Sequence, residues 1–518
     1  MNASESAASA SAPLTADTSE LNDIIQLPSE GSSDQMALAP LFDEFAFPGP
    51  ASLDLSSLLI PDWVFRDALP PLDSFTSQAQ PASLTPWIAE ANPTPNLIGC
   101  PPNEPDLVPY FPSEEQRQLY RHFISEAAPN LLVIECSSNP WLVHLSPLLL
   151  ARPSGQDVAH DAARSALLSL ASFDIGMRMN QTLREPQSNS MYRMSDVYRS
   201  EAIKMLEIGK WANVLKDEAA DLAVATAVLL ATRDRLAGSQ EWEEPIGYGV
   251  DVIMSHGGPA AFLSRQVNAT RRFLVEQMAF VELLGALTNW IAPKILGWDN
   301  DAWLMDSSRE DDHLQLVYGW DRATVQICAR SMSLFDAARR IESLKRSNAA
   351  TKYSSIAASI KSGEMFMAER TGQLLNELAQ LRAQASPLVP STRAVRGITS
   401  TLLCLEIALL TDGAQPEEAL REERVQSKVR AVLSTIEEAI SQGMYSGFLF
   451  PLIWMAVCAV SENRQRVEGL LTQIQPYYPI DRGLMGRLVQ FKWSDYACAD
   501  IDSWISMMKV TKTYVPVF

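Results

Sequence analysis

Basic residues are almost missing from the first hundred positions of the sequence. This stretch contains 13 Asp or Glu residues and a single base, Arg66, so it carries −12 of the chain's net charge of −20. Over the whole chain, acids outnumber bases 62 to 42. Nucleic-acid binding draws much of its affinity from Lys and Arg that neutralise phosphates, so we expect no strong direct binding to nucleic acid.

Clustered cysteines and long apolar runs are also absent. No two of the six cysteines lie within 30 residues of each other, which excludes CxxC pairs and zinc knuckles and favours reduced, mostly buried thiols. The longest apolar stretch, residues 448–460, contains Pro451 and is shorter than the roughly 20 residues that span a bilayer. We interpret it as a buried core helix and expect no membrane insertion.

The signatures of catalytic and nucleotide sites are missing as well. The sequence contains no GxxxxGK[ST], no HExxH, no GxSxG, and no GxGxxG between a strand and a helix. We therefore expect no metal and no cofactor, and we predict that the protein is not an enzyme. Two polar motifs receive structural interpretations: HGGP at 256–259 as a helix-ending turn, and REDDH at 309–313 as the charged start of a long helix.

Aromatic and basic residues of the second half have similar structural interpretations. Large aromatics at such spacing usually belong to a core, although they could also line a small-molecule pocket between helices: Trp290, Trp298, Trp303 and Trp320. Three short basic pairs are interpreted as solvated helix faces: Arg271 and Arg272, Arg339 and Arg340, and Lys345 and Arg346.

Residues 1–112 hold 17 of the 32 prolines together with abundant Ser, Ala, Asp and Glu. Such a composition buries too little apolar surface to offset the entropy of ordering, so we predict a disordered acidic segment. Two stretches within it interleave acids with large apolar residues, a pattern typical of activation domains. Their predicted anchors, which would bury in a partner's apolar groove, are Leu41, Phe42, Phe45, Phe47, Trp63 and Phe65. Packing of these residues onto the chain's own folded domain is the alternative.

Order is predicted to begin near Ser113, which has capping-box spacing to Gln116. Helical periodicity dominates residues 113–518, and no run shows the sustained alternation that a sheet requires. The sequence thus predicts an all-α protein: a large multi-helix domain after the acidic segment. The longest predicted helices are 158–180, 191–214, 217–235, 269–292, 312–346, 351–384, 391–411 and 417–442.

The order of motifs in this helical part is distinctive. An aromatic helix (QRQLYRHFISEAAPNLLVIE) leads to SSNPWLVHLSPLLL, with Asn139, Pro140 and Trp141, and then to the Ala/Leu helix ARSALLSLASFDIG. Near the far end come Phe450-Pro451-Leu452, the charged helix ENRQRVEGLL, and Trp504 before two methionines. From about 113 to 510 this order resembles the regulatory domain of the fungal-specific transcription factor family.

The resemblance implies a nuclear transcriptional regulator whose helical domain governs activity in response to a ligand or partner. Family members read DNA through an N-terminal binuclear zinc cluster of six cysteines. Here only Cys100 precedes residue 136, so we expect that module to be absent and the protein to act through a DNA-bound transcription factor or the transcription machinery. The resemblance also implies a secondary-metabolite gene cluster as context and allows a homo- or heterodimer. The alternatives are a helical small-molecule sensor or enzyme with an interhelical pocket, and a scaffold without a transcriptional role.

Overall fold

The computed structural model describes residues 106–132, 136, 138–181, 185–211, 217–237, 241–265, 268–289, 291–298, 300–305, 313–346, 354–388, 421–441 and 448–474. Within these ranges every regular element is a helix and no strand occurs, which confirms the all-α prediction. The predicted helix 391–411 lies outside the described residues.

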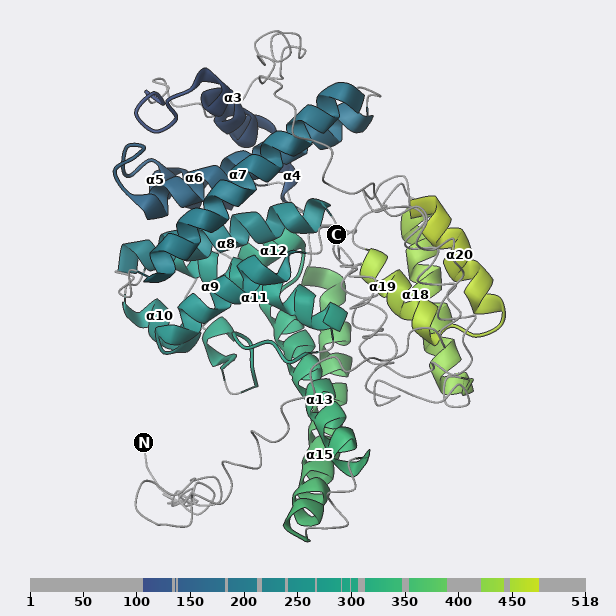
Figure 1. Cartoon of the computed structure of the whole chain (residues 1–518). Coiled ribbons are helices and arrows are strands. Elements are labelled where there is room, and N and C mark those ends of the chain that lie inside the picture. The colour runs from purple at the N-terminus through teal and green to yellow at the C-terminus, as the bar shows by residue number, and fades with distance from the viewer. Residues whose placement is uncertain are drawn as a thin grey trace, which may run out of the picture. The chain divides into compact units, whose positions relative to one another are not determined.

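The described helices run as follows along the chain (Figure 1). The first group is α3 (Glu114–His122), the π-helix η6 (Phe123–Ala127), α4 (Ala128–Asn130), α5 (Pro140–Leu149), α6 (Val158–Gln181), α7 (Glu185–Trp211), α8 (Asp217–Ala237), α9 (Glu243–Ser255), α10 (Gly258–Arg265) and α11 (Ala269–Asn289). The second group is the 3-10 helix η7 (Ala302–Met305), α12 (His313–Tyr318), α13 (Arg322–Arg346), α15 (Ser354–Leu388), α18 (Glu423–Ser441), α19 (Leu449–Cys458) and α20 (Glu462–Ile474).

Local sequence signals set the first helix starts. Ser113 Oγ accepts a hydrogen bond from the Gln116 backbone N–H at 3.1 Å, and Gln116 Oε1 accepts from the Ser113 N–H at 3.4 Å. This reciprocal pair is the predicted capping box at the start of α3. The Asn139 side chain caps α5 in the same way by accepting from the Trp141 N–H at 2.9 Å, with Pro140 in the first helical position.

Three helices, α6, α8 and α11, are buried around their whole circumference. They therefore form the centre of the helical bundle. α6 is buried from Ala162 to Gly176, α8 from Ala220 to Arg235, and α11 is almost entirely buried from Arg271 to Leu287. Small residues let these helices pack closely. Ser169 Oγ donates to the Ser195 carbonyl on α7 and Ser195 Oγ donates to the Ser169 carbonyl, both at 2.8 Å, so α6 and α7 are joined without an unpaired hydroxyl.

One predicted helix is interrupted. The prediction of a single helix over 312–346 is wrong, because the described part of this segment forms α12 and α13 with a break at residues 319–321. Gly319 adopts a φ of +73°, a left-handed conformation that ends α12. The Asp321 carboxylate then accepts from the Thr324 N–H at 2.7 Å and caps the start of α13. The prediction for 256–259 holds: α9 ends at Ser255, and Gly257 has a φ of +94°.

α13 and α15 lie side by side as an antiparallel pair (Figure 1). Arg330 of α13 meets Glu377 of α15 at 3.4 Å, and further along Lys345 meets Glu364 at 2.7 Å. Separately, α18, α19 and α20 contact one another around the apolar face of α18. Gln426 of α18 donates to the Cys458 carbonyl and accepts from Asn463 Nδ2, each at 3.0 Å. The apolar run 448–460 thus contains a buried helix, as predicted.

Two helical glycines, Gly285 and Gly469, should respond differently to replacement by alanine, because only the first is closely packed. A Cβ on Gly285 of α11 would lie 2.6 Å from the Trp242 ring, whereas a Cβ on Gly469 of α20 would meet nothing within 4 Å. We expect Gly285→Ala to lower the free energy of unfolding by about 1–3 kcal/mol because the ring must move. Gly469→Ala should instead raise it by up to about 1 kcal/mol, since alanine favours the helix. Urea unfolding followed by circular dichroism measures both; equal effects would contradict the packing.

Candidate functional site: the buried ionic core

The predicted activation anchors lie outside the residues that the structure describes: Leu41, Phe42, Phe45, Phe47, Trp63 and Phe65. Their role therefore stays a prediction. In the described part of the chain, the most concentrated polar chemistry lies inside the helical bundle. Arginines and carboxylates that are almost fully buried there join one helix to another, as Arg199 does with Asp234 and Arg271 with Asp221.

The largest of these groups is centred on Glu276 of α11, which is completely buried. Glu276 Oε1 accepts hydrogen bonds from Arg272 Nε at 2.5 Å and from Arg322 Nη2 at 3.0 Å. Its Oε2 lies 3.3 Å from His313 Nδ1. We call these four side chains and the neighbouring His144 the Glu276 cluster. One carboxylate thus joins α11, the first residue of α12 and the first residue of α13.

Arg272 extends the cluster to η7. Its Nη1 and Nη2 atoms donate to the carbonyls of Trp303 at 2.8 Å and Leu304 at 3.1 Å. The guanidinium carbon also lies 4.9 Å from the centroid of the Trp303 ring. A single arginine therefore pairs with a charge, with two backbone oxygens and with an aromatic face, which compensates for its removal from water.

Two histidines carry the cluster on to α5. His144 Nε2 lies 3.3 Å from His313 Nε2, and His144 Nδ1 lies 3.3 Å from the Thr270 hydroxyl. Since the Glu276 carboxylate only accepts, we assign the proton of His313 to Nδ1. His313 Nε2 then accepts from His144 Nε2–H, and His144 Nδ1 accepts from Thr270. This chain gives every ring nitrogen a partner of the correct kind.

The charge state of Glu276 follows from its neighbours. Burial by itself raises the pKa of this carboxyl, but the hydrogen bond from His313 and the positive charges of Arg272 and Arg322 outweigh it and hold the pKa below its ordinary value. Glu276 is therefore ionised at neutral pH. A buried anion of this kind stabilises the position of every helix that supplies a cation or a donor, and the cluster acts as a structural cross-link.

Arg271, the neighbour of Arg272, forms a second buried pair. It is completely buried, and its Nε and Nη2 donate to the two carboxylate oxygens of Asp221 on α8 at 2.7 and 3.1 Å. It also donates to the Phe262 carbonyl at 3.2 Å and lies over the Phe262 ring. The interpretation of Arg271 and Arg272 as a solvated helix face is therefore wrong. The i, i+4 spacing of Arg272 and Glu276 was a usable signal, whereas nothing in the sequence pointed to Asp221.

A third group joins α7 to α8. Arg199 Nε and Nη2 donate to the two oxygens of Asp234, each with a 2.8 Å contact, and Asp234 is completely buried. Arg233 Nη1 donates to the same carboxylate at 2.9 Å, while its other nitrogens bond to Ser195 Oγ at 3.0 Å and to Asp196. Two arginines from different helices thus share one buried aspartate.

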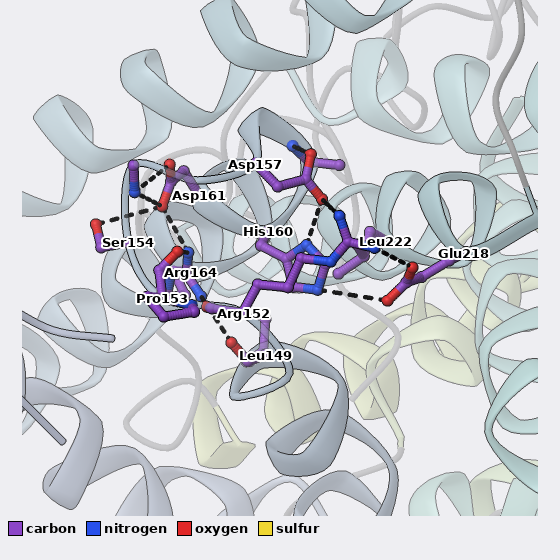
Figure 2. A network of polar contacts seen from close by, with 12 residues as sticks. Leu149, Arg152, Pro153, Ser154, Asp157, His160, Asp161, Arg164, Glu218 and Leu222 are labelled. Carbon is purple, nitrogen blue, oxygen red and sulfur yellow. Dashed lines mark hydrogen bonds and ion pairs between the residues drawn. The ribbon is translucent and has the colours of Figure 1, made fainter. Parts of the chain in front are cut away.

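The fourth group closes the loop between α5 and α6 (Figure 2). His160 of α6 is completely buried; its Nδ1 lies 2.5 Å from Asp157 Oδ2 and its Nε2 lies 3.9 Å from Glu218 Oε1. Arg164 donates to the carbonyls of Leu149 at 2.8 Å and Arg152 at 2.7 Å. Since these carbonyls lie at and beyond the end of α5, Arg164 satisfies acceptors that the helix itself leaves open.

The structure also places the aromatic, thiol and other basic residues considered above. Trp303 and Trp320 are buried, as predicted, and Trp298 lies beneath Arg330 and Arg370; Trp290 lies outside the described residues. Arg340 is exposed, as predicted for a solvated face. Burial raises the pKa of Cys328 well above its ordinary value, so this thiol stays protonated.

Two kinds of specialised site do not occur among the described residues. Among them, no three or more His, Cys, Asp or Glu side chains form a group that could hold a metal ion. None of the described helices is both long enough and apolar enough to cross a membrane.

A profile of the fungal specific transcription factor domain matches residues 118–513. The chain belongs to this fungal-specific transcription factor domain family. The match nearly coincides with the range 113–510 over which the motif order suggested it, and it confirms that resemblance. No curated protein and no solved structure matches the chain.

Membership supports a role in transcriptional regulation for the helical part of the chain. The family is a transcription factor domain rather than a class of enzyme. The ionic core lies inside the matched range, so the buried arginine–carboxylate pairs belong to the fungal-specific transcription factor domain of this chain and define how its helices α5 to α13 are held.

Replacing Glu276 by Gln tests the central cluster. The variant leaves Arg272 and Arg322 without their buried anion, so we expect unfolding at pH 7 to require about 3–5 kcal/mol less than in the wild type. The folded-state pKa of Glu276 lies below its unfolded value of 4.5, so its contribution is complete above that pH. The difference between the two proteins should shrink as the pH falls through the folded-state pKa. Urea unfolding at several pH values measures it; a difference independent of pH would contradict the assignment.

Replacing Arg271 by Leu tests the second pair. Asp221, only 5% exposed, would lose both hydrogen bonds from its cationic partner, and we expect a loss of about 3–5 kcal/mol in the free energy of unfolding. The matched control is Arg340→Leu, which removes an arginine that is 76% exposed and should cost less than about 1 kcal/mol. Thermal and urea unfolding compare the two variants. Similar losses at both positions would show that burial of the pair does not matter.

Proposed function

We propose that the protein is a transcriptional regulator or coactivator that acts through a DNA-bound partner. The observation that carries this proposal is the match to the transcription factor domain over residues 118–513, preceded by a segment with −12 net charge and interleaved aromatics. In this proposal residues 1–112 recruit the transcription machinery, and residues 113–518 form the helical regulatory domain that docks on a partner.

The chemistry of the acidic segment supports activation. Its charge keeps the chain solvated, so that large apolar side chains remain available to a partner with an apolar groove. Six residues supply the anchors: Leu41, Phe42, Phe45, Phe47, Trp63 and Phe65. Since acids outnumber bases 62 to 42 over the chain, we propose that contact with DNA is supplied by the partner. We further propose nuclear localisation, no enzymatic activity, and a secondary-metabolite gene cluster as the regulated target.

A tethered reporter tests the activation step. The full chain and residues 1–112 are each fused to an unrelated DNA-binding domain, and both should activate transcription. Replacing Phe42, Phe45, Trp63 and Phe65 by Ala should reduce the reporter signal to background, because buried aromatic anchors carry most of the energy of such interfaces.

The matched control replaces four large apolar residues outside the two acidic–aromatic stretches, Leu84, Trp87, Leu97 and Ile98, by Ala. This variant should keep most of its activity at an equal protein level, which immunoblotting checks. Activity that survives the loss of the anchors, or that both variants lose equally, would refute the assignment of those anchors.

A further inference from the structure

The long helix α15 carries a face that no other described helix covers. Its buried side chains, Ile360, Leu374 and Leu378, lie toward α13. Gly363 belongs to the same side, because a Cβ there would lie 2.9 Å from Ile341 Cδ1 of α13. With about 3.6 residues per turn, Leu374 and Met365 point in opposite directions. Met365 is 67% exposed, so α15 presents an apolar residue to solvent on the side away from α13.

The residues around Met365 form one continuous exposed surface. Between residues 358 and 372, seven positions lie within about 60° of Met365 around the helix axis, and all seven are exposed. We call them the Met365 face: Ala358, Lys361, Ser362, Met365, Ala368, Glu369 and Gly372. Most are small, and a Cβ on Gly372 would meet nothing within 4 Å. A second helix could therefore approach this face closely.

The Met365 face is complementary to itself: residues at equal distances before and after Met365 would face each other in an antiparallel pair of such helices. Four residues before Met365 stands Lys361, and four residues after it stands Glu369. Three residues away on the two sides stand Ser362 and Ala368, and seven residues away stand Ala358 and Gly372. Small residues thus match small residues, and a positive charge matches a negative one.

We propose that the Met365 face binds a second copy of this chain, with the two α15 helices antiparallel about a two-fold axis at Met365. In such an isologous contact, residue i of one copy meets residue j of the other and the reverse contact follows by symmetry. Met365 meets the partner's Met365, and Lys361 meets the partner's Glu369 at two equivalent places. A parallel pair would instead place Lys361 against Lys361, so the charges select the antiparallel arrangement.

Within the part of the chain that the structure describes, Glu369 accepts one long hydrogen bond of 3.4 Å, from Gln373 of its own helix. The stretch from Ala358 to Gly372 is about 22 Å long, which is shorter than a standard dimer interface requires. We therefore expect a reversible dimer with a Kd in the micromolar range. This inference goes beyond the proposed function and does not depend on it, since a dimer could form whatever the protein regulates.

Charge reversal in the full chain tests the pairing. Sedimentation velocity from about 1 to 100 μM should show a monomer–dimer equilibrium for the wild type. Lys361→Glu and Glu369→Lys, each placing like charges together at two sites, should weaken the dimer roughly tenfold or more at low salt. The double variant K361E/E369K should restore it. These residues are eight positions apart on one helix, so the restoration cannot come from a contact within one copy.

A cysteine at the symmetry centre tests the geometry. Met365→Cys should give a disulfide-linked dimer under mild oxidation, while Gln380→Cys, also exposed on α15, should not. In the antiparallel pair two copies of residue 380 are about 45 Å apart. Three results would each overturn the proposal: a wild type that stays monomeric, a double variant that fails to recover, or a thiol in the Met365→Cys variant that another part of its own chain shields from maleimide. None of these outcomes affects the tethered reporter result.

Discussion

Charged side chains can be removed from water only when partners of opposite charge and good geometry replace the lost hydration, and this constraint governs the core of the helical domain. Glu276 illustrates it. Its carboxylate is fully buried and accepts from donors on three helices. A shift of any of these helices would separate a buried charge from its partner. A buried ion with several fixed partners disfavours any other placement of the helices that supply them. The relative positions of α11, α12 and α13 therefore depend on one carboxylate.

The other ionic groups extend the same logic along the chain. Arg271 ties α11 to α8 through Asp221, and Arg199 ties α7 to α8 through Asp234. Between these contacts the helices pack through buried apolar side chains, such as Phe273 and Phe280 of α11 and Leu222 of α8. The polar contacts add fixed partners and directions to this packing. This division of labour explains why α6, α8 and α11 can be buried on all sides and still contain arginines and carboxylates.

Much of this architecture is legible from the sequence because its signals are local. The capping box at Ser113 and the helix-ending turn at 256–259 depend on residues a few positions apart, and both were predicted. The interruption at Gly319 was missed because apolar periodicity continues across it, so one glycine outweighed a pattern of about thirty residues. The burial of Arg271 was missed for a different reason: its partner, Asp221, is fifty positions away, and an arginine pair on a helix reads equally well as a solvated face.

The helical domain and the acidic N-terminal segment use their charged residues in different ways. Inside the bundle, buried charges are paired with opposite charges on neighbouring helices, as Arg271 is with Asp221, and these pairs hold the helices in place. Residues 1–100 have acids with almost no bases, and we propose that this charge guides the segment to basic surfaces of a partner. The Met365 face lies between these extremes, with opposite charges placed symmetrically and left in solvent. A charge that pairs with an opposite charge inside the same chain stabilises the fold. A charge that stays exposed can pair with an opposite charge on another molecule and so favours association.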